Sequence, residues 1–317
     1  MVLKVGIVGT GVMGLNHARI VNESERAELT MVYDTNIEAS KDAARRWNTT
    51  AAASIDQLSN CDAVIVASST QSHESIGRRF VEEGKALLIE KPLCVEVNQT
   101  SKLLRLCEEK NTVLLCGFVE RFNPAISAAL KLIDGPVRHV LSIRHSPYNS
   151  RASSGVVTDL LIHDLDLTSR LAPTAKPDYV GASQWTPSNG TFAETVNCTI
   201  DFNNQMTTIQ SASRWGQRKV REISISTDSL TLELDLIRSN VTAYRHRSYP
   251  ASDVGGPASY RTETMIEIPF VRHSGEPLAM QFDHFVNLAT DFADRAEERR
   301  SIEPPHILAE LVSSASR

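Results

Sequence analysis

The sequence lacks the features that mark membrane proteins, nucleic-acid-binding proteins and repeat proteins. It has no apolar run near the length of about 20 residues that a membrane-spanning helix needs, and no internal repeat or low-complexity tract. The formal net charge of −5 gives no reason to expect nucleic acid as a partner. The first strand-like run begins by residue 3, which leaves no room for a secretory signal peptide. We therefore expect a cytoplasmic protein with no membrane partner.

Cysteine is also scarce. The five cysteines are scattered, without a Cys-x-x-Cys pair or a neighbouring His cluster. Their spacing favours small buried apolar side chains in a reducing compartment, and we expect no metal site. They are Cys61, Cys94, Cys107, Cys116 and Cys198.

The most informative feature present is a glycine-punctuated turn close to residue 10. Gly9-x-Gly11-x-x-Gly14 follows a β-branched run and precedes a helical pattern. In a dinucleotide-binding turn, the first glycine permits the tight turn and the second lets a pyrophosphate approach the backbone. The third lets the helix pack close to the strand, and the helix N-terminus offers free N–H groups to the phosphates. The pattern predicts a dinucleotide-binding loop made of Gly9, Thr10, Gly11, Val12, Met13 and Gly14.

Asp34, which closes the next apolar run, bears on the choice of cofactor. A carboxylate at the end of the second strand accepts hydrogen bonds from the adenosine ribose and repels a 2′-phosphate. Alternatively, Asp34 only starts the turn Asp34-Thr35-Asn36, since aspartate is common in turns. Its position favours the first interpretation, and therefore NAD over NADP.

The pattern changes near residue 120, which predicts two domains, 1–120 and 121–317. The first part alternates strand-like runs with amphipathic stretches such as 37–47 and 98–109. This alternation is typical of right-handed crossovers and of a parallel sheet covered on both faces. We expect a doubly wound α/β Rossmann domain that binds NAD. Its expected strands are 3–8, 29–33, 63–67, 86–89 and 113–116.

The second part predicts an α+β domain for substrate binding and oligomerisation. Consecutive alternating runs with short turns indicate a large, mostly antiparallel open sheet with one face polar or covered by a partner. Helical patterns occur at 125–132, 156–171 and 277–298, and the last is expected to pack back before a short tail. The expected strands include 137–145, 191–202, 206–213, 220–227, 230–236 and 241–249.

Glu90-Lys91-Pro92 is the first chemical candidate, directly after the expected strand 86–89. In an open parallel sheet, ligands bind outside the carboxyl ends of the strands, so the tripeptide is expected beside a nicotinamide. A partly desolvated lysine there can hold a substrate hydroxyl and shuttle its proton, and a cis Lys91–Pro92 bond is compatible with the turn. The alternative is a solvated lysine before a strand-ending proline. On these three residues alone, the alternative is the better interpretation.

The second candidate is Asp159-Leu-Leu-Ile-His163-Asp-Leu-Asp166 within the helical pattern 156–171. Asp159 and His163 are four residues apart and are expected on one helix face, continued by Asp166 and Arg170. Histidine suits proton abstraction near neutral pH, and a neighbouring carboxylate would orient it or bind a sugar hydroxyl. The alternative is an exposed polar face with Asp159–His163 and Asp166–Arg170 pairs. Taken alone, the motif gives the two interpretations roughly even weight.

Taken in order, these motifs resemble the glucose–fructose oxidoreductase / inositol dehydrogenase (Gfo/Idh/MocA) family. The order is Gly-x-Gly-x-x-Gly, then Glu-Lys-Pro, then Asp-x-x-x-His-x-x-Asp. The resemblance covers nearly the whole chain, and its wording is most similar to the branch that contains UDP-N-acetylglucosamine 3-dehydrogenases. Further matches are Ser68-Ser-Thr-Gln-Ser-His73, Gly117-Phe-Val-Glu-Arg121-Phe-Asn123-Pro and Glu276-Pro-Leu278.

The resemblance implies roles for several residues. Lys91, Asp159 and His163 would form the catalytic group, and Arg121 and Asn123 would reach the substrate. Two departures from the family pattern, Leu161 in place of glycine and Ser154-Gly155 in place of paired glycines, affect local packing and substrate fit. The residues implied along the cofactor are Ser68, Ser69, His73, Glu90 and Lys91. For His73, a helix-capping or core histidine is an equally good interpretation.

The resulting hypothesis is an NAD-dependent dehydrogenase that oxidises a secondary hydroxyl of a sugar or nucleotide sugar. Lys91 and His163, distant in sequence, are expected to act on one substrate. The alternatives are an inositol or free-sugar dehydrogenase, an enzyme that uses bound NAD in a redox-neutral elimination or hydrolysis, and a non-catalytic dinucleotide-binding regulator.

The resemblance and the open sheet together indicate a homodimer or homotetramer. Arg214, Arg218, Lys219 and Arg221 form a basic cluster that could bind a diphosphate, although a solvated strand face is the better interpretation.

Overall fold

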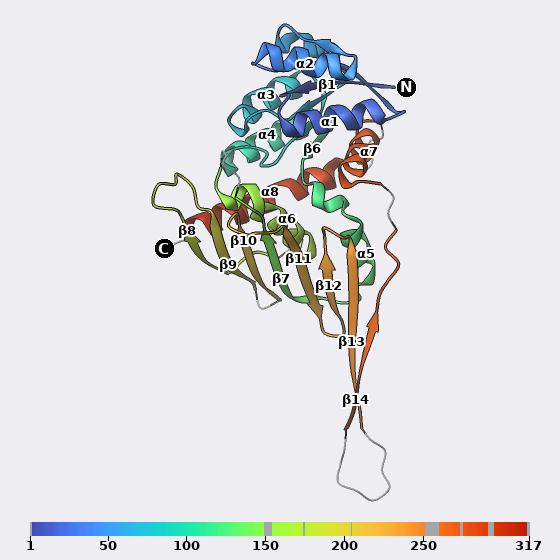
Figure 1. The fold of residues 1–317 in the computed structure, drawn as a ribbon, viewed down its shortest axis with the longest axis vertical. Coiled ribbons are helices and arrows are strands. Elements are labelled where there is room, and N and C mark those ends of the chain that lie inside the picture. Colours follow the sequence, from blue (N-terminus) through green and yellow to red (C-terminus); the bar gives the residue numbers. More distant parts are fainter. Residues whose placement is uncertain are drawn as a thin grey trace, which may run out of the picture. The chain divides into compact units, whose positions relative to one another are not determined.

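The chain folds into two compact units, which Figure 1 shows as a ribbon. The computed structural model describes residues 2–148, 154–173, 175–203, 205–250, 260–272, 275–290 and 295–315. Unit 1 comprises Met1–Val119 and Gly275–Glu310, and unit 2 comprises Glu120–Ser274 and Leu311–Arg317. The chain therefore passes from unit 1 to unit 2, returns to unit 1 with Gly275–Glu310 and ends in unit 2.

Unit 1 is built on a six-stranded parallel sheet in the order β3-β2-β1-β4-β5-β6. Its central strands are apolar on both faces, as a sheet covered by helices on both sides requires. This confirms the doubly wound α/β prediction, although the two-residue β3 was too short to show in the sequence pattern. The strands are β1 (Leu3–Val8), β2 (Ala27–Tyr33), β3 (Thr50–Ala51), β4 (Ala63–Val66), β5 (Ala86–Ile89) and β6 (Leu114–Cys116).

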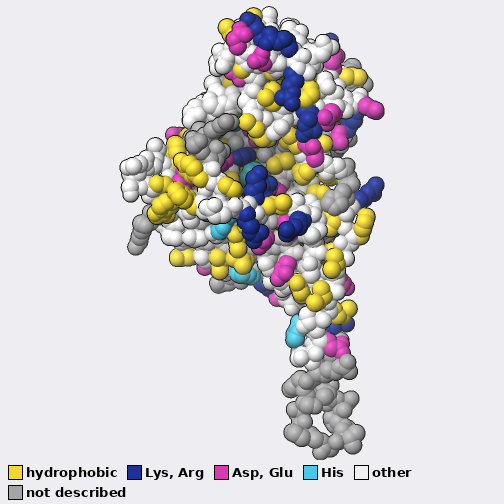
Figure 2. Space-filling view, in the orientation of Figure 1, with side chains coloured by type: hydrophobic (Ala, Val, Ile, Leu, Met, Phe, Trp, Pro, Cys, Tyr) yellow, Lys and Arg dark blue, Asp and Glu magenta, His cyan; other side chains and the backbone are white. Residues whose placement is uncertain are grey.

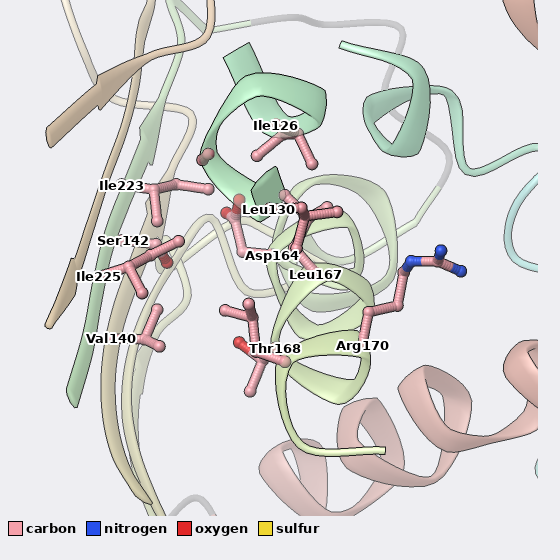
Figure 3. A pocket seen from close by; sticks show the side chains of 12 residues that line it. Ile126, Leu130, Val140, Ser142, Asp164, Leu167, Thr168, Arg170, Ile223 and Ile225 are labelled. Atoms are coloured by element: carbon pink, nitrogen blue, oxygen red, sulfur yellow. The ribbon is translucent and has the colours of Figure 1, made fainter. Parts of the chain in front are cut away.

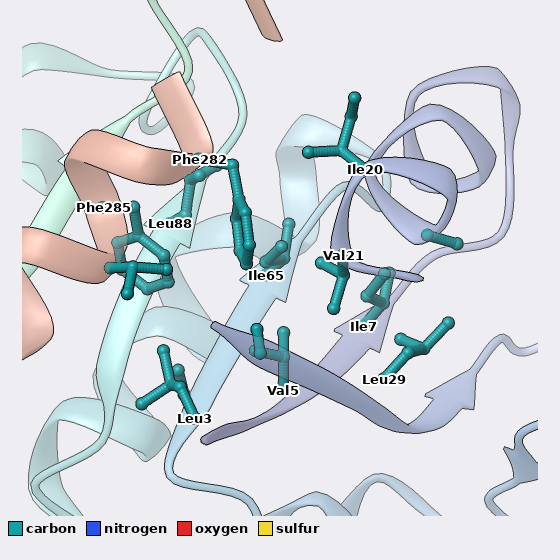
Figure 4. Close-up of a cluster of buried hydrophobic side chains, with 14 of the residues drawn as sticks. Leu3, Val5, Ile7, Ile20, Val21, Leu29, Ile65, Leu88, Phe282 and Phe285 are labelled. Carbon is teal, nitrogen blue, oxygen red and sulfur yellow. The ribbon is translucent and has the colours of Figure 1, made fainter. Parts of the chain in front are cut away.

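The helices of unit 1 include one that comes from the far end of the chain. In α7 (Pro277–Thr290), Phe282 and Phe285 are buried in the same apolar cluster as Val5, Ile65 and Leu88 (Figure 4). Truncating a buried phenylalanine typically costs about 3–5 kcal/mol, so α7 is part of the core of unit 1. The other helices are α1 (Val12–Glu23), α2 (Ile37–Trp47), the 3₁₀ helix η1 (Ile55–Asn60), α3 (Thr70–Glu82) and α4 (Val97–Glu109).

The expectation of a short tail after residue 298 is wrong. Helix α8 spans Arg295–Ser314, with Pro304 and Pro305 inside it. Proline usually ends a helix because it lacks an N–H donor and clashes with the preceding turn. Ile302 and Leu308 are buried on either side of the two prolines, and we infer that this apolar packing outweighs the lost hydrogen bonds.

Unit 2 is built on an eight-stranded sheet in the order β14-β13-β12-β11-β7-β10-β9-β8. Neighbouring strands are antiparallel except β7 and β10, which run parallel. The prediction of a large, mostly antiparallel sheet is thus confirmed. The strands are β7 (Val137–His145), β8 (Tyr179–Trp185), β9 (Thr195–Phe202), β10 (Met206–Ser213), β11 (Val220–Thr227), β12 (Thr231–Asp235), β13 (Asn240–Pro250) and β14 (Tyr260–Glu267).

Helices α5 (Pro124–Leu132) and α6 (Ile162–Leu171) pack on one face of this sheet. Figure 3 shows Ile223 and Ile225 of the sheet pointing toward Leu167 of α6. On the opposite face, the paired residues Leu141 and Ile209 are 37% and 44% exposed. Hydrophobic side chains are exposed over the strands of unit 2 in Figure 2. That face of the sheet is therefore not covered by the described part of the chain.

Candidate functional site

The glycine turn of unit 1 needs glycine at two positions for purely steric reasons. Gly9 has φ +94°, a conformation that side chains disfavour, and a Cβ there would lie 2.6 Å from the backbone of Ala67. A Cβ on Gly14 would lie 1.9 Å from the carbonyl oxygen of Gly9. The turn and the close approach of α1 to β1 therefore depend on these two glycines.

Gly11 differs, because a Cβ at this position would meet no protein atom within 4 Å. Its φ of −67° suits any residue, so neither the fold nor the local backbone explains why it is glycine. Gly11 is also the N-cap of α1, and this end of the helix has no side-chain cap and no acid in its first turn. Free N–H groups beside open space fit the pyrophosphate of a dinucleotide.

Asp34, at the end of β2, binds the glycine turn directly. The Thr10 N–H and hydroxyl donate to Asp34 Oδ2 at 2.7 and 2.9 Å, and the Asn36 N–H donates to Oδ1 at 2.9 Å. Burial alone would raise the pKa of Asp34, but these hydrogen bonds outweigh it and hold the pKa below its usual value. Asp34 thus starts the expected turn and also presents a carboxylate beside the dinucleotide loop.

The Glu90-Lys91-Pro92 segment follows β5, at the same edge of the parallel sheet as the glycine turn. The Lys91–Pro92 peptide bond is cis. The Glu90 side chain is buried, Nε2 of His17 lies 2.8 Å from its Oε1, and the Lys91 N–H donates to its Oε2 at 3.2 Å. Burial raises the pKa of Glu90, but the hydrogen bond from His17 and the charge of Lys91 lower it further than burial raises it. Glu90 is therefore a buried carboxylate beside the expected catalytic lysine.

His73 of α3 links two loops at this edge of the sheet. Its Nδ1 lies 3.0 Å from the Pro92 carbonyl oxygen, and its Nε2 lies 3.2 Å from that of Ser68. Burial lowers the pKa of His73 more than these contacts raise it. Ser68 also contacts Ser72 through its hydroxyl, and Ser69 is the N-cap of α3. These contacts give His73 a structural role, and direct contact of His73, Ser68 and Ser69 with a cofactor stays a prediction.

In unit 2, Asp159 and His163 lie where an irregular helix begins. Residues Val157–Leu161 form a π-helical turn, η3, which continues into α6. Turns of this kind are rare in proteins, and those that occur are often found at functional sites. Nothing in the sequence pattern 156–171 indicated one. The Asp159 side chain is 36% exposed, and His163 is partly buried.

A buried arginine holds Asp159. The Arg214 guanidinium is buried after β10 and donates to Asp159 Oδ2 at 3.1 Å. It also donates to Glu194 Oε2 and to the Ser154 carbonyl oxygen, both at 2.7 Å. The interpretation of the basic cluster as a solvated strand face is thus wrong for Arg214, which is buried. Its partners could not be predicted because they are distant in sequence.

Two further ion pairs flank His163 in the chain. Arg144 of β7 donates to both oxygens of Asp164 at 2.8 and 2.9 Å, and to Glu120 at 2.9 Å. Arg121, in the 3₁₀ turn η2 (Val119–Phe122), donates through Nε to both oxygens of Asp166 at 2.9 and 3.1 Å. The carboxylates on either side of His163 are therefore buried and paired with arginines from other elements.

The alternative of an exposed Asp166–Arg170 pair is wrong, since Asp166 is buried against Arg121. Arg170 is exposed, and Figure 3 shows its guanidinium pointing away from the pocket lined by α6. Asn123 caps α5 by accepting from the Ala125 N–H, and it donates to Glu120 and to the Leu236 carbonyl oxygen. These contacts give Arg121 and Asn123 structural roles, and their reach to a substrate stays a prediction.

Comparison with known proteins agrees with both parts of the fold. Residues 3–118 match the model of the Gfo/Idh/MocA family, described as an oxidoreductase family with an NAD-binding Rossmann fold. UDP-N-acetylglucosamine 3-dehydrogenase of Acidithiobacillus ferrooxidans is 27% identical over 83% of this chain and 82% of its own length. Its solved structure superposes with a TM-score of 0.86 over 100% of this chain and 98% of that one, at 24% identity. Residues 3–118 are therefore similar to the NAD-binding Rossmann domain of the Gfo/Idh/MocA oxidoreductases, and the whole chain shares the fold of the solved 3-dehydrogenase.

Two further proteins are similar to this chain, one in sequence and one in fold. Inositol 2-dehydrogenase of Rhizobium meliloti is 29% identical over 53% of this chain and 54% of its own length, so the match covers about half of that relative. The structure of GenD2 from gentamicin A biosynthesis, in complex with NAD, superposes with a TM-score of 0.83 at 19% identity. It covers 99% of this chain and 94% of that one, and at this identity it shows the fold alone.

No group of three or more His, Cys, Asp or Glu side chains could hold a metal ion among the described residues. None of the described helices is both long and apolar enough to cross a membrane. The five cysteines are all free and buried.

Proposed function

We propose that this oxidoreductase oxidises a secondary hydroxyl of a sugar or nucleotide sugar with NAD. The observation that carries the proposal is the arrangement at one edge of the unit 1 sheet. There Gly11 leaves open space at the start of α1, and Lys91 follows β5. A non-catalytic regulator would need the first of these features but has no use for the second together with Asp159 and His163.

NAD is the proposed cofactor because of Asp34. Gly11 and the N-terminus of α1 fit the pyrophosphate, and Asp34 fits the ribose hydroxyls. The lowered pKa of Asp34 keeps it anionic at neutral pH, where it repels a 2′-phosphate. When bound, the nicotinamide ring supplies the hydride acceptor. In Asp34→Ala, the ratio of the Kd for NADP to that for NAD should fall at least tenfold, and an unchanged ratio would refute the assignment.

His163, Lys91 and Asp159 have distinct roles in the proposed reaction. His163 accepts the proton of the substrate hydroxyl, because imidazole changes charge near neutral pH. The Lys91 ammonium donates a hydrogen bond to the same oxygen as negative charge develops on it. Asp159, held by Arg214, orients His163 or binds the neighbouring hydroxyl. Which of Lys91 and His163 is the general base follows from the pH profiles of the single variants.

Single and double variants test these roles. Lys91→Met and His163→Asn should each lower turnover by about 10²-fold or more, with the Kd for NAD retained. If both act on one proton transfer, the double variant loses little more than the worse single variant. Lys131→Met and His139→Asn, which alter residues of α5 and β7 outside this group, are the controls. Near-normal turnover in both single variants rules out the assignment.

The substrate is proposed to be a nucleotide sugar, by likeness to UDP-N-acetylglucosamine 3-dehydrogenase. Inositol or a free sugar is the second candidate, because several similar proteins are inositol dehydrogenases. A panel of UDP-sugars and polyols assayed by NADH absorbance separates the two. A Michaelis constant for the UDP-sugar that rises with salt would support the charged substrate. Substrate consumption without NADH release would instead indicate a redox-neutral reaction.

The open face of the unit 2 sheet is the proposed surface for a homodimer or homotetramer. Leu141 and Ile209 lie opposite each other on adjacent strands and are exposed there. Leu141→Lys should shift the mass measured by light scattering toward the monomer, whereas Arg170→Ala on α6 should not. The five buried free cysteines fit a reducing compartment such as the cytoplasm.

A further inference from the structure

The buried pair of His17 and Glu90 is not explained by the fold alone. His17 lies on α1, three residues after Gly14, and is fully buried. Its Nε2 is 2.8 Å from Glu90 Oε1, while its Nδ1 is buried without a hydrogen-bond partner among the described residues. Burying an imidazole and a carboxylate costs free energy, which their mutual hydrogen bond offsets only in part.

The geometry fixes which way this pair is oriented. A carboxylate only accepts hydrogen bonds, so Nε2 of His17 carries the proton and donates it to Oε1. The second oxygen, Oε2, accepts the Lys91 N–H at 3.2 Å. Gly117 completes the enclosure, since a Cβ there would lie 2.7 Å from Oε2. Glu90 is therefore held between α1, the backbone of Lys91 and the segment after β6.

The charges around Glu90 are few. The titratable groups that face it are His17 from α1, Lys91 beside it and His73 from α3, while Gly117 offers only backbone. Burial favours the neutral form of His73, and the contacts that keep Glu90 anionic are first those with His17 and then those with Lys91.

We propose that His17 is a positioning residue for Lys91, acting through Glu90. By donating to Oε1, it keeps Glu90 anionic and turned so that Oε2 receives the Lys91 backbone. The Lys91 backbone is then held where its side chain can donate to the substrate oxygen. Because His17 lies on the helix that begins at Gly11, the same pair connects the dinucleotide loop to the lysine. This inference rests on the proposed function, in which Lys91 takes part in the reaction.

The test compares turnover and its pH profile in the full-length enzyme saturated with NAD. His17→Leu removes the donor, so Glu90 should protonate more readily. The acidic limb of kcat should then move up by roughly one pH unit. Because Glu90 would also no longer hold the Lys91 backbone in place, kcat at neutral pH should separately fall about tenfold. His17→Gln, whose amide can donate to Oε1, should restore most of both. Glu90→Gln removes the titrating carboxyl, so the part of the acidic limb that Glu90 contributes should disappear.

A second histidine–glutamate pair in unit 1 provides the matched control. His284 of α7 lies 3.1 Å from Glu298 of α8 through Nε2. His284→Leu should leave both limbs of the pH profile where they are in the natural enzyme. If His17→Leu does not fold, His17→Gln and Glu90→Gln still give two different predictions for the acidic limb.

The outcomes separate this inference from the proposed function. If Lys91→Met retains turnover, both fail. If Lys91→Met abolishes turnover but His17→Leu and Glu90→Gln keep the natural pH profile, His17 has only a structural role and the inference alone is overturned. Loss of thermal stability in His17→Leu with unchanged pH limbs overturns the inference in the same way.

Discussion

Two alanine substitutions in the glycine turn should affect different properties. Gly14→Ala should lower the stability of the fold, whereas Gly11→Ala should weaken cofactor binding. Gly14→Ala places a methyl group 1.9 Å from the carbonyl oxygen and 2.8 Å from the carbonyl carbon of Gly9. Both are backbone atoms that cannot rotate away, so the variant should lose about 3 kcal/mol, the upper end of overpacking costs. For a unit of this size, that lowers the melting temperature by roughly 6–12 °C.

Gly11→Ala meets no atom within 4 Å, and its φ of −67° is available to alanine. The reduced freedom of the unfolded chain stabilises by about 0.4–1 kcal/mol, which the poorer N-cap offsets by a similar amount. The melting temperature without cofactor should therefore stay within about 3 °C of that of the natural protein. The added methyl group occupies the approach of the pyrophosphate. Losing one hydrogen bond to a charged group costs about 1.5–3 kcal/mol, so NAD should bind roughly 10- to 100-fold more weakly.

Thermal unfolding by circular dichroism and NAD titration by calorimetry measure these two effects separately. The reasoning is refuted if Gly11→Ala binds NAD as tightly as the natural protein. It is equally refuted if Gly11→Ala loses as much thermal stability as Gly14→Ala, since that would mean that the open space beside Gly11 is not open.

Three further predictions concern stability. Arg121→Leu removes the arginine that donates to both oxygens of the buried Asp166 and should lower the unfolding free energy in urea by about 3–5 kcal/mol. The exposed control Arg170→Leu should change it by less than about 0.5 kcal/mol, and equal losses would contradict the buried pair. Glu90 has a native pKa below its ordinary value of 4.5, so its contribution is complete above pH 4.5 and is lost as the pH falls through the native value. The difference in unfolding free energy between the natural protein and Glu90→Gln should therefore shrink below pH 4.5, and a constant difference would be evidence against an anionic Glu90. Phe282→Ala should lower the unfolding free energy of unit 1 by about 3–5 kcal/mol, and a loss below 1 kcal/mol would show that α7 is not part of its core.

The features that the sequence predicted well are those set by near neighbours in the chain. The glycine turn is recognisable because its three glycines are closely spaced within one strand–turn–helix segment. Strand β7 was predicted at its observed bounds because its residues alternate between a covered and an open face. Asp34 was recognisable because a carboxylate at the end of a second strand has a fixed place in this fold.

The features that the sequence could not predict depend on contacts between distant residues. His17 and Glu90 are 73 positions apart, and Arg121 and Asp166 are 45 apart. Neither pair has a local pattern, and Asp166 had a nearer apparent partner in Arg170. Helix α8 was missed for the opposite reason, since Pro304 and Pro305 are strong local signals that tertiary packing overrides.

The placement of charge around His163 has a physical rationale that goes beyond stability. Buried ion pairs contribute little net stability, because desolvating both charges offsets their attraction. The residues on either side of His163, Asp164 and Asp166, are nevertheless paired with Arg144 of β7 and Arg121 of η2. Two apolar contacts could hold α6 on the sheet equally well, but they would tolerate rotation and sliding. Bidentate arginine–carboxylate pairs fix both direction and distance, so they hold α6 in one orientation and with it the imidazole of His163.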